Sequence, residues 1–179
     1  RQIPGVSGVI TALHDIPAGE AWTYEDVMKR KQEVEAKGLK LVGVESINVH
    51  EDIKIGLPTR DKLIENYNKS LEAVGKADIH LVCYNFMPVF DWTRTDLAMP
   101  LEDGSTALAY DASIINGIDA SEMFDRIEQA SGGFVMPGWE PNRRDEIMDL
   151  FDKYKDVTAD KLRENFKYFL DGIMPTCEK

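Results

Sequence analysis

The chain has 179 residues, of which 43% are apolar, so it is long enough to bury one sizeable core. Its 32 acidic and 21 basic side chains give a net charge of −11, which argues against a nucleic-acid partner because phosphate binding needs a basic face. The sequence has no apolar run near the roughly 18 to 20 residues of a membrane span, no signal-peptide pattern and no CxxC pair. We therefore expect an acidic cytoplasmic protein that has no membrane partner and keeps Cys83 and Cys177 reduced.

The chain begins with a strand, a helix and a second strand. A nearly continuous apolar run predicts a strand at 8–13 that is buried on both faces. Thr23 is placed to cap a helix over 24–37, which Gly38 is placed to end. A second apolar run predicts the next strand at 39–44.

A second helix and a third strand continue this order. After a loop that contains His50, Thr59 can cap a helix with one apolar stripe, and a third strand is expected at 79–84. Strand, helix, strand, helix, strand at roughly 30 to 40 residues per unit is typical of parallel βαβ winding.

The regular alternation stops between about residue 87 and residue 157. The residues at 102–105 predict a hairpin turn, and those at 131–133 and 137–139 predict irregular loop. We therefore expect a long insertion after the third strand. Thr158 can then cap a last helix with an apolar face.

The predicted fold class is α/β, and the predicted architecture is a partial TIM (β/α)8 barrel. A complete barrel takes eight strands and about 250 residues, so three strands cannot close one. The chain also starts at Arg1 and not at Met. We expect residues 1–179 to be an incomplete single barrel domain from a longer protein, with the insertion at about 87–157. A complete small doubly wound domain is the structural alternative.

Polar side chains follow each of the three expected strands. In parallel α/β folds the active site lies at the carboxyl ends of the strands. The residues there are His14 and Asp15, then Glu45, Ser46 and His50, then Asn85, Asp91, Trp92 and Arg94. Taken singly, each is better explained as a loop residue or a helix cap. Their recurrence at successive strand ends makes a functional site an equally good explanation.

Two of these groups suggest specific chemistry. His50, Glu51 and Asp52 carry metal-binding side chains, but three adjacent residues rarely all point at one ion, so no metal ligand is assigned. Aromatic residues surround Arg94, which could bind a carboxylate through two parallel hydrogen bonds, although an aromatic plug under the insertion is equally compatible. The sequence contains no glycine-rich phosphate loop, nucleophile elbow or HExxH. The catalytic residues therefore stay unknown.

Several segments resemble the mannonate dehydratase family, and they occur in the same order along the chain. The segments are 11–17, 49–54, 83–96, 101–106 and 161–169. The resemblance runs from end to end and weakens only between about residues 111 and 157. The aromatic segment at 84–96 is long and unusual enough that chance is a poor explanation.

This resemblance implies a TIM barrel of the xylose-isomerase-like kind and a lyase activity. The lyase would dehydrate D-mannonate to 2-keto-3-deoxy-D-gluconate in hexuronate (glucuronate) catabolism, a step of carbohydrate metabolism, with a divalent ion that is typically Mn2+. The family pattern implies that the metal ligands and the acid/base tyrosine lie beyond these residues. This chain alone is therefore expected to be inactive.

The same resemblance directs the choice of site residues and partners. The expected substrate-binding residues are His50, Asn85, Trp92 and Arg94, with Glu45 as a weaker candidate. Asp91 is expected to hold Arg94 in place. The expected partners are a small-molecule sugar acid and further copies of the chain in a homo-oligomer.

Two other interpretations of the function stay open. One is another metal-dependent sugar isomerase or epimerase of the same barrel superfamily, which the types of metal ligand would distinguish. The other is an inactive fragment that folds only with its missing half or with an oligomeric partner, which open strand edges would support.

Overall fold

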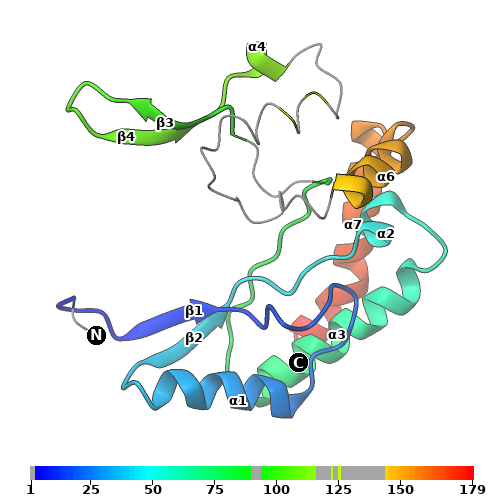
Figure 1. Cartoon of the computed structure of the whole chain (residues 1–179). Coiled ribbons are helices and arrows are strands. Elements are labelled where there is room, and N and C mark those ends of the chain that lie inside the picture. Colours follow the sequence, from blue (N-terminus) through cyan, green and yellow to red (C-terminus); the bar gives the residue numbers. More distant parts are fainter. Residues whose placement is uncertain (1–2, 90–93, 116–121, 123–124, 126–143) are drawn as a thin grey trace. The chain divides into compact units, whose positions relative to one another are not determined.

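The computed structural model describes residues 3–89, 94–115, 122, 125 and 144–179. The chain divides into two compact units, and both contain helices and strands (Figure 1). The first unit is Arg1–Phe86 with Val157–Lys179, and the second is Met87–Asp156.

The first unit contains the parallel strand pair that the sequence predicts. Strands β1 (Gly8–Thr11) and β2 (Lys40–Val44) are parallel, and helix α1 (Tyr24–Glu35) connects them. The segment around Val82 lies beside β2, because Val44 forms a parallel bridge with Val82. Strand β1, strand β2 and this segment are therefore neighbours in the order in which they occur along the chain. The βαβ winding is confirmed. The described strands form two two-stranded sheets and no closed barrel.

The prediction of a full third strand at 79–84 is wrong. This segment forms one parallel bridge, in which Val44 N–H donates to the Leu81 carbonyl at 2.9 Å and Cys83 N–H donates to the Val44 carbonyl at 2.9 Å. Val44, the last residue of β2, is the β2 residue in this bridge. The segment therefore runs beside β2 without extending the ladder.

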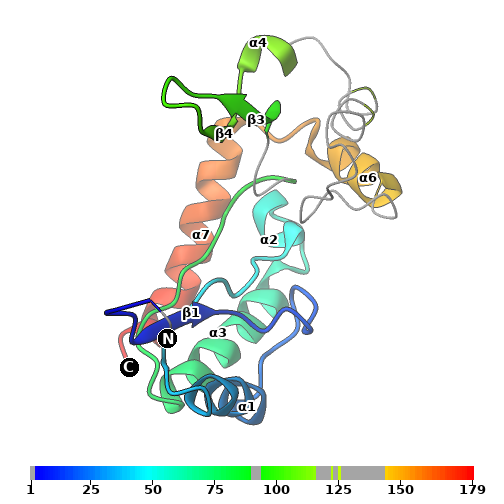
Figure 2. The ribbon, with the colours of Figure 1, turned by 60° about the vertical axis from the view of Figure 1, so that its left-hand side comes forward.

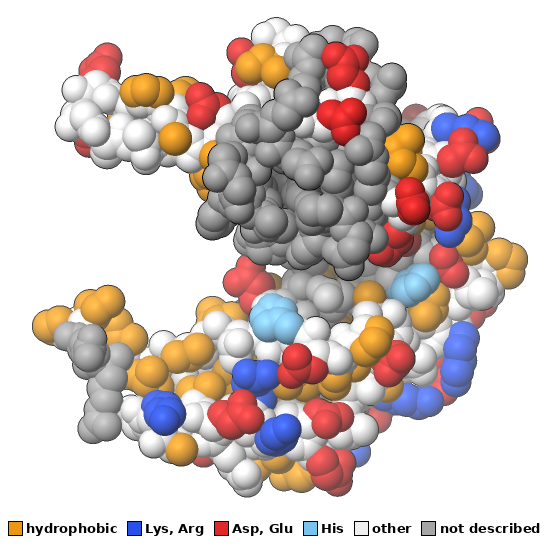
Figure 3. Space-filling view, viewed as in Figure 1, with side chains coloured by type: hydrophobic (Ala, Val, Ile, Leu, Met, Phe, Trp, Pro, Cys, Tyr) orange, Lys and Arg blue, Asp and Glu red, His pale blue; other side chains and the backbone are white. Residues whose placement is uncertain are grey.

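Within the described residues the strand at 8–11 is not buried on both faces, in contrast to the prediction for 8–13. Other described residues pack against one face of the β1–β2 pair, where Leu41 and Val44 belong to the hydrophobic core. On the other face Ile10, Val42 and Leu81 keep 44%, 47% and 47% of their surface exposed. Figure 3 shows hydrophobic side chains along this part of the first unit, with charged side chains below them.

Helix α1 begins at the residue that the sequence predicts, because Thr23 and Asp26 form a capping box. Thr23 Oγ1 accepts the Asp26 N–H at 3.1 Å, and the Asp26 carboxylate accepts the Thr23 N–H at 3.3 Å. The helix ends at Glu35, two residues earlier than expected. Gly38 then takes a positive φ of 74°, a conformation that glycine adopts without strain.

A short helix, α2 (Glu51–Ile55), occupies the segment that was expected to be a loop. Helix α3 (Arg60–Lys76) follows, and Thr59 is its N-cap residue as predicted. The Thr59 hydroxyl makes no cap hydrogen bond, and it donates to Asp52 Oδ2 at 2.6 Å. The expected capping interaction is therefore replaced by a contact between α2 and the start of α3.

Helix α7 (Ala159–Cys177), near the C-terminus of the sequence, belongs to the first unit. Thr158 caps it as predicted by accepting the Lys161 N–H at 3.2 Å. The helix packs against α2 and α3, which lie beside it in both Figures 1 and 2. Phe169 is fully buried, and its ring meets Tyr67 of α3 edge to face with 5.0 Å between the ring centroids.

The second unit contains the predicted hairpin. Strands β3 (Asp96–Pro100) and β4 (Thr106–Ala109) are antiparallel, and the Leu101 N–H donates to the Ser105 carbonyl at 2.9 Å across the turn. Gly104 has a φ of 82° in that turn. The unit also contains α4 (Ala112–Ile115) and α6 (Arg144–Tyr154).

None of the helices in the described residues is both long enough and apolar enough to cross a bilayer.

Candidate functional site

Three chain segments of the first unit end at one edge, as the parallel winding requires. The Glu45 N–H donates to the Thr11 carbonyl at 3.0 Å, which joins the end of β1 to the residue after β2. The Cys83 N–H donates to the Val44 carbonyl, so the third segment reaches the same edge. Glu45 is exposed and Asn85 is half-buried. The structure therefore places both residues just beyond the carboxyl ends of neighbouring segments.

The other residues predicted from the sequence have different surroundings. Arg94 is half-buried and belongs to the second unit. Trp92 and Asp91 lie outside the described residues. Asp15 is exposed, and its carboxylate lies 3.8 Å from the guanidinium of Arg30 in α1. Asp15 is therefore an exposed partner of α1.

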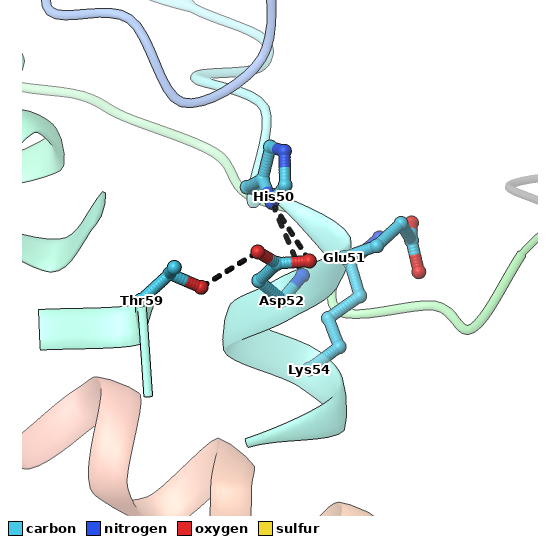
Figure 4. A network of polar contacts seen from close by, with 5 residues as sticks. All are labelled: His50, Glu51, Asp52, Lys54 and Thr59. Atoms are coloured by element: carbon cyan, nitrogen blue, oxygen red, sulfur yellow. Dashed lines mark hydrogen bonds and ion pairs between the residues drawn. The ribbon is translucent and has the colours of Figure 1, made fainter. Parts of the chain in front are cut away.

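His50 is held at the N-terminus of α2, where it is the N-cap residue. Its Nδ1 accepts the backbone N–H of Asp52 at 3.1 Å (Figure 4). Its carbonyl accepts the Ile53 N–H at 3.0 Å. Gly19, from the loop after β1, lies so close that a Cβ there would be 3.1 Å from His50 Cδ2. The ring is therefore fixed by the loop after β1 and by the helix after β2.

Asp52 and Thr59 form the next contacts of this network. Asp52 Oδ2 accepts the Thr59 hydroxyl at 2.6 Å, and Asp52 Oδ1 lies 3.7 Å from His50 Nδ1 (Figure 4). The side chains of His50 and Asp52 are 34% and 23% exposed. This network is partly open to solvent on the His50 side.

The other face of α2 is anchored in the unit by a buried ion pair and by α7. The Lys54 ammonium lies 2.6 Å from Glu51 Oε1, and the Lys54 side chain is only 5% exposed. The Lys54 carbonyl accepts the Asn165 amide N–H of α7 at 2.8 Å. In a longer helix this carbonyl would accept the N–H of residue 58, but Pro58 has none to donate. Asn165 thus supplies a donor that the local sequence lacks.

The described residues do not provide a manganese site. They contain no group of three or more histidine, cysteine, aspartate or glutamate side chains that could hold a metal ion. The His50 Nδ1 lone pair accepts the amide of Asp52, and the Asp52 carboxylate accepts the Thr59 hydroxyl. The cluster at 50–52 is therefore organised as a helix cap.

Sequence reasoning missed the supporting roles of Gly19, Asp52 and Thr59. The helix α2 was detectable, because its first turn is acidic, Lys54 lies in its last turn and Gly56 follows it with a φ of 84°. No local signal joins Gly19 to His50, since 31 positions separate them in the chain numbering. That contact follows from the parallel packing of β1 and β2.

The chain matches known proteins along its whole length. The family model described as D-mannonate dehydratase (UxuA) matches residues 1–179. A mannonate dehydratase of Brachyspira hyodysenteriae is 61% identical over 179 residues, which are 100% of this chain and 50% of that protein. A mannonate dehydratase of Thermotoga maritima is 54% identical over the same 179 residues, again 50% of that protein. The chain thus spans about half the length of the curated relatives it matches.

A solved structure is similar to the chain as well. The crystal structure of mannonate dehydratase from Streptococcus suis serotype2 aligns with a TM-score of 0.79 and 44% sequence identity. The alignment covers 98% of this chain and 44% of the Streptococcus suis chain. The family model and these similarities agree, and the chain belongs to the D-mannonate dehydratase family.

Proposed function

We propose that the whole protein to which these residues belong is a lyase that dehydrates D-mannonate to 2-keto-3-deoxy-D-gluconate in hexuronate breakdown. The observation that carries this proposal is 61% identity to a mannonate dehydratase along the entire chain. The grouping of Glu45, His50 and Asn85 after parallel segments supports it, because ligands of parallel α/β folds bind beyond the carboxyl ends of the strands.

For the fold of the whole protein we propose a xylose-isomerase-like (β/α)8 barrel. Strands β1 and β2 and the segment at Val82 would be three neighbouring strands of this barrel, since they are parallel and adjacent in chain order. The exposed face with Ile10, Val42 and Leu81 suits the interior of such a barrel, which apolar side chains fill.

The reaction removes a proton next to a carboxylate and expels a hydroxide. It needs a base, an acid and a positive group that stabilises the charge that develops on the substrate. We keep the proposal that a divalent ion, typically Mn2+, supplies this stabilisation when bound. Because the described residues do not fit a metal, its ligands would lie elsewhere in the whole protein. The part of this chain is to bind and orient the sugar acid.

We propose that Glu45, His50, Asn85, Trp92 and Arg94 line the substrate side of the pocket. Arg94 is the candidate for the substrate carboxylate, since a guanidinium can bind both carboxylate oxygens. We expect Arg94→Ala in the whole protein to weaken substrate binding by roughly 1.5 to 3 kcal/mol. An unchanged KM and kcat would remove Arg94 from the site.

The whole protein is further proposed to be a cytoplasmic homo-oligomer. The two free cysteines, Cys83 and Cys177, suit a reducing compartment. Leu108 and Tyr110 of the second unit are 57% and 55% exposed, and we propose that they contribute to contacts between subunits. Light scattering of the purified whole protein would test this, and a monomeric mass would contradict it.

The activity is tested by incubating the whole protein with D-mannonate and Mn2+ and following the appearance of the 2-keto-3-deoxy acid. D-gluconate, which differs only at C2, is the matched control substrate. We expect turnover of D-mannonate that stops with a chelator and returns with Mn2+. Interconversion of aldoses and ketoses without dehydration would favour an isomerase, and residues 1–179 alone are expected to be inactive.

A further inference from the structure

The imidazole ring of His50 has one nitrogen whose role is fixed by the backbone. The Asp52 N–H lies 3.1 Å from His50 Nδ1, and a backbone amide can only donate. Nδ1 must therefore accept and carries no proton in this arrangement. In a neutral imidazole the proton then resides on Nε2, which becomes a hydrogen-bond donor.

The Nε2 side of the ring is the side that faces away from α2. Figure 4 shows the second ring nitrogen of His50 pointing away from Asp52 and from the helix. Among the described residues no hydrogen bond to Nε2 is found, and a third of the side chain is exposed. Two amides in the first turn of α2, those of Asp52 and Ile53, donate to His50. The imidazole Nε2–H is therefore a donor that these contacts leave available.

The surroundings hold the ring in this orientation. Gly19 has a φ of 90°, and a Cβ there would come within 3.1 Å of His50 Cδ2 and 2.7 Å of Leu63 Cδ2. Asp52 is held in turn, because its Oδ2 accepts the Thr59 hydroxyl at 2.6 Å. Ring and carboxylate are therefore positioned before any ligand arrives, which reduces the entropy lost on binding.

We propose that His50 is a substrate-binding residue that donates its Nε2–H to an oxygen of a polyhydroxy carboxylate, and that Gly19, Asp52 and Thr59 position it. This inference rests on the proposed function and assigns His50 a specific role within it. With its proton on Nε2 the ring cannot take a proton there, so His50 is not the base of the reaction.

Two substitutions separate the donor from the helix cap. His50→Asn keeps an acceptor near Nδ1 and a favoured N-cap residue but removes the Nε2 donor. His50→Gln places an amide donor near Nε2 and gives up the favoured cap. In the whole protein we expect His50→Asn to lower kcat/KM for D-mannonate by about ten- to a hundredfold, mostly through KM. His50→Gln is expected to retain more of the activity.

His80→Asn is the control for losing a histidine. Thr59→Val tests the positioning role, and Thr158→Val is its control for losing a threonine hydroxyl. His80 is exposed and bonds to Asp78, so His80→Asn is expected to leave KM unchanged. Thr59→Val removes the hydroxyl that holds Asp52 and is expected to raise KM a few-fold. Thr158→Val removes the cap of α7, and is expected to lower stability without changing KM.

Nitrogen-15 NMR of the whole protein measures the tautomer without any substrate. We expect the signals that disappear in His50→Asn to show a protonated Nε2 and an unprotonated Nδ1. An Nδ1–H tautomer, or wild-type kinetics for His50→Asn, would overturn the inference. If the unaltered protein does not dehydrate D-mannonate, the proposed function fails and the substrate role of His50 fails with it. Turnover by the unaltered protein together with wild-type kinetics for His50→Asn removes only the role of His50.

Discussion

Replacing Asn165 by alanine should loosen α2 more than any other part of the first unit. Asn165 is 2% exposed, and its amide donates to the Lys54 carbonyl at 2.8 Å. Its Oδ1 also lies 3.5 Å from the Arg60 guanidinium and would be 2.6 Å from a Cβ at Gly56. The side chain therefore fills the space at the C-terminus of α2 and supplies the donor that Pro58 lacks.

The expected cost follows from these contacts. A buried carbonyl that loses its donor costs about 1 to 3 kcal/mol, and the space left by the amide adds a smaller cavity cost. We expect a total of about 2 to 3 kcal/mol. Asn165→Leu fills the volume without restoring the donor, so it should recover only the cavity part.

Hydrogen exchange of the whole protein can locate this loss. The amides of Gly56 and Leu57, which donate to the Asp52 carbonyl at 3.0 and 2.9 Å, report on α2 directly. Asn68→Ala is the matched control, because the Asn68 amide donates to the Gly172 carbonyl at 3.0 Å and so also joins α3 to α7. Equal exchange rates at Gly56 and Leu57 in wild type and Asn165→Ala would refute this account of how α2 is held.

Three further predictions concern single residues of the first unit. Tyr67→Phe should leave stability unchanged or raise it by up to about 1 kcal/mol in chemical denaturation, because the buried Tyr67 hydroxyl finds no hydrogen-bond partner among the described residues; a clear loss would contradict this. Gly56→Ala should cost roughly 2 to 4 kcal/mol, because φ is 84° and the new Cβ would meet Asn165; near-native stability would show that Asn165 can move away. The ammonium groups of Lys69 and Lys62 lower the pKa of Glu65 from 4.5 to about 2, so these ion pairs should persist above pH 4.5 and be lost as the pH falls towards 2. An NMR titration midpoint of Glu65 near 4.5 would contradict the pairing.

The helices with clear end signals were predictable from sequence. Thr23 with Asp26 and Thr158 begin α1 and α7 because a side-chain oxygen three residues upstream satisfies an amide of the first turn. The hairpin turn at 102–105 was predictable for the same local reason, since Asp103 and Gly104 favour a turn. The order of parallel segments also follows from the sequence, because the apolar runs and helical stripes alternate.

Three features depended on neighbours that are remote in sequence. The segment at 79–84 has the composition of a strand, but it pairs with β2 only through the bridge between Val44 and Val82. Thr59 has the side chain of a helix cap, yet its hydroxyl bonds to Asp52 because α2 lies next to it. The open face at Ile10 and Val42 could not be inferred, since burial depends on what packs against a strand.

For the candidate site, too, some features were predictable from local sequence and others depended on the tertiary structure. The sequence alone determined the family resemblance and the choice of Glu45, His50 and Asn85, because polar residues after parallel strands come to one edge wherever the winding is parallel. Only the tertiary structure decided that His50 is pressed against Gly19 and that α2 rests on Asn165, 111 positions from Lys54. Local patterns specify backbone shape within a few residues, whereas the orientation of an imidazole ring is set by whichever groups the fold brings against it.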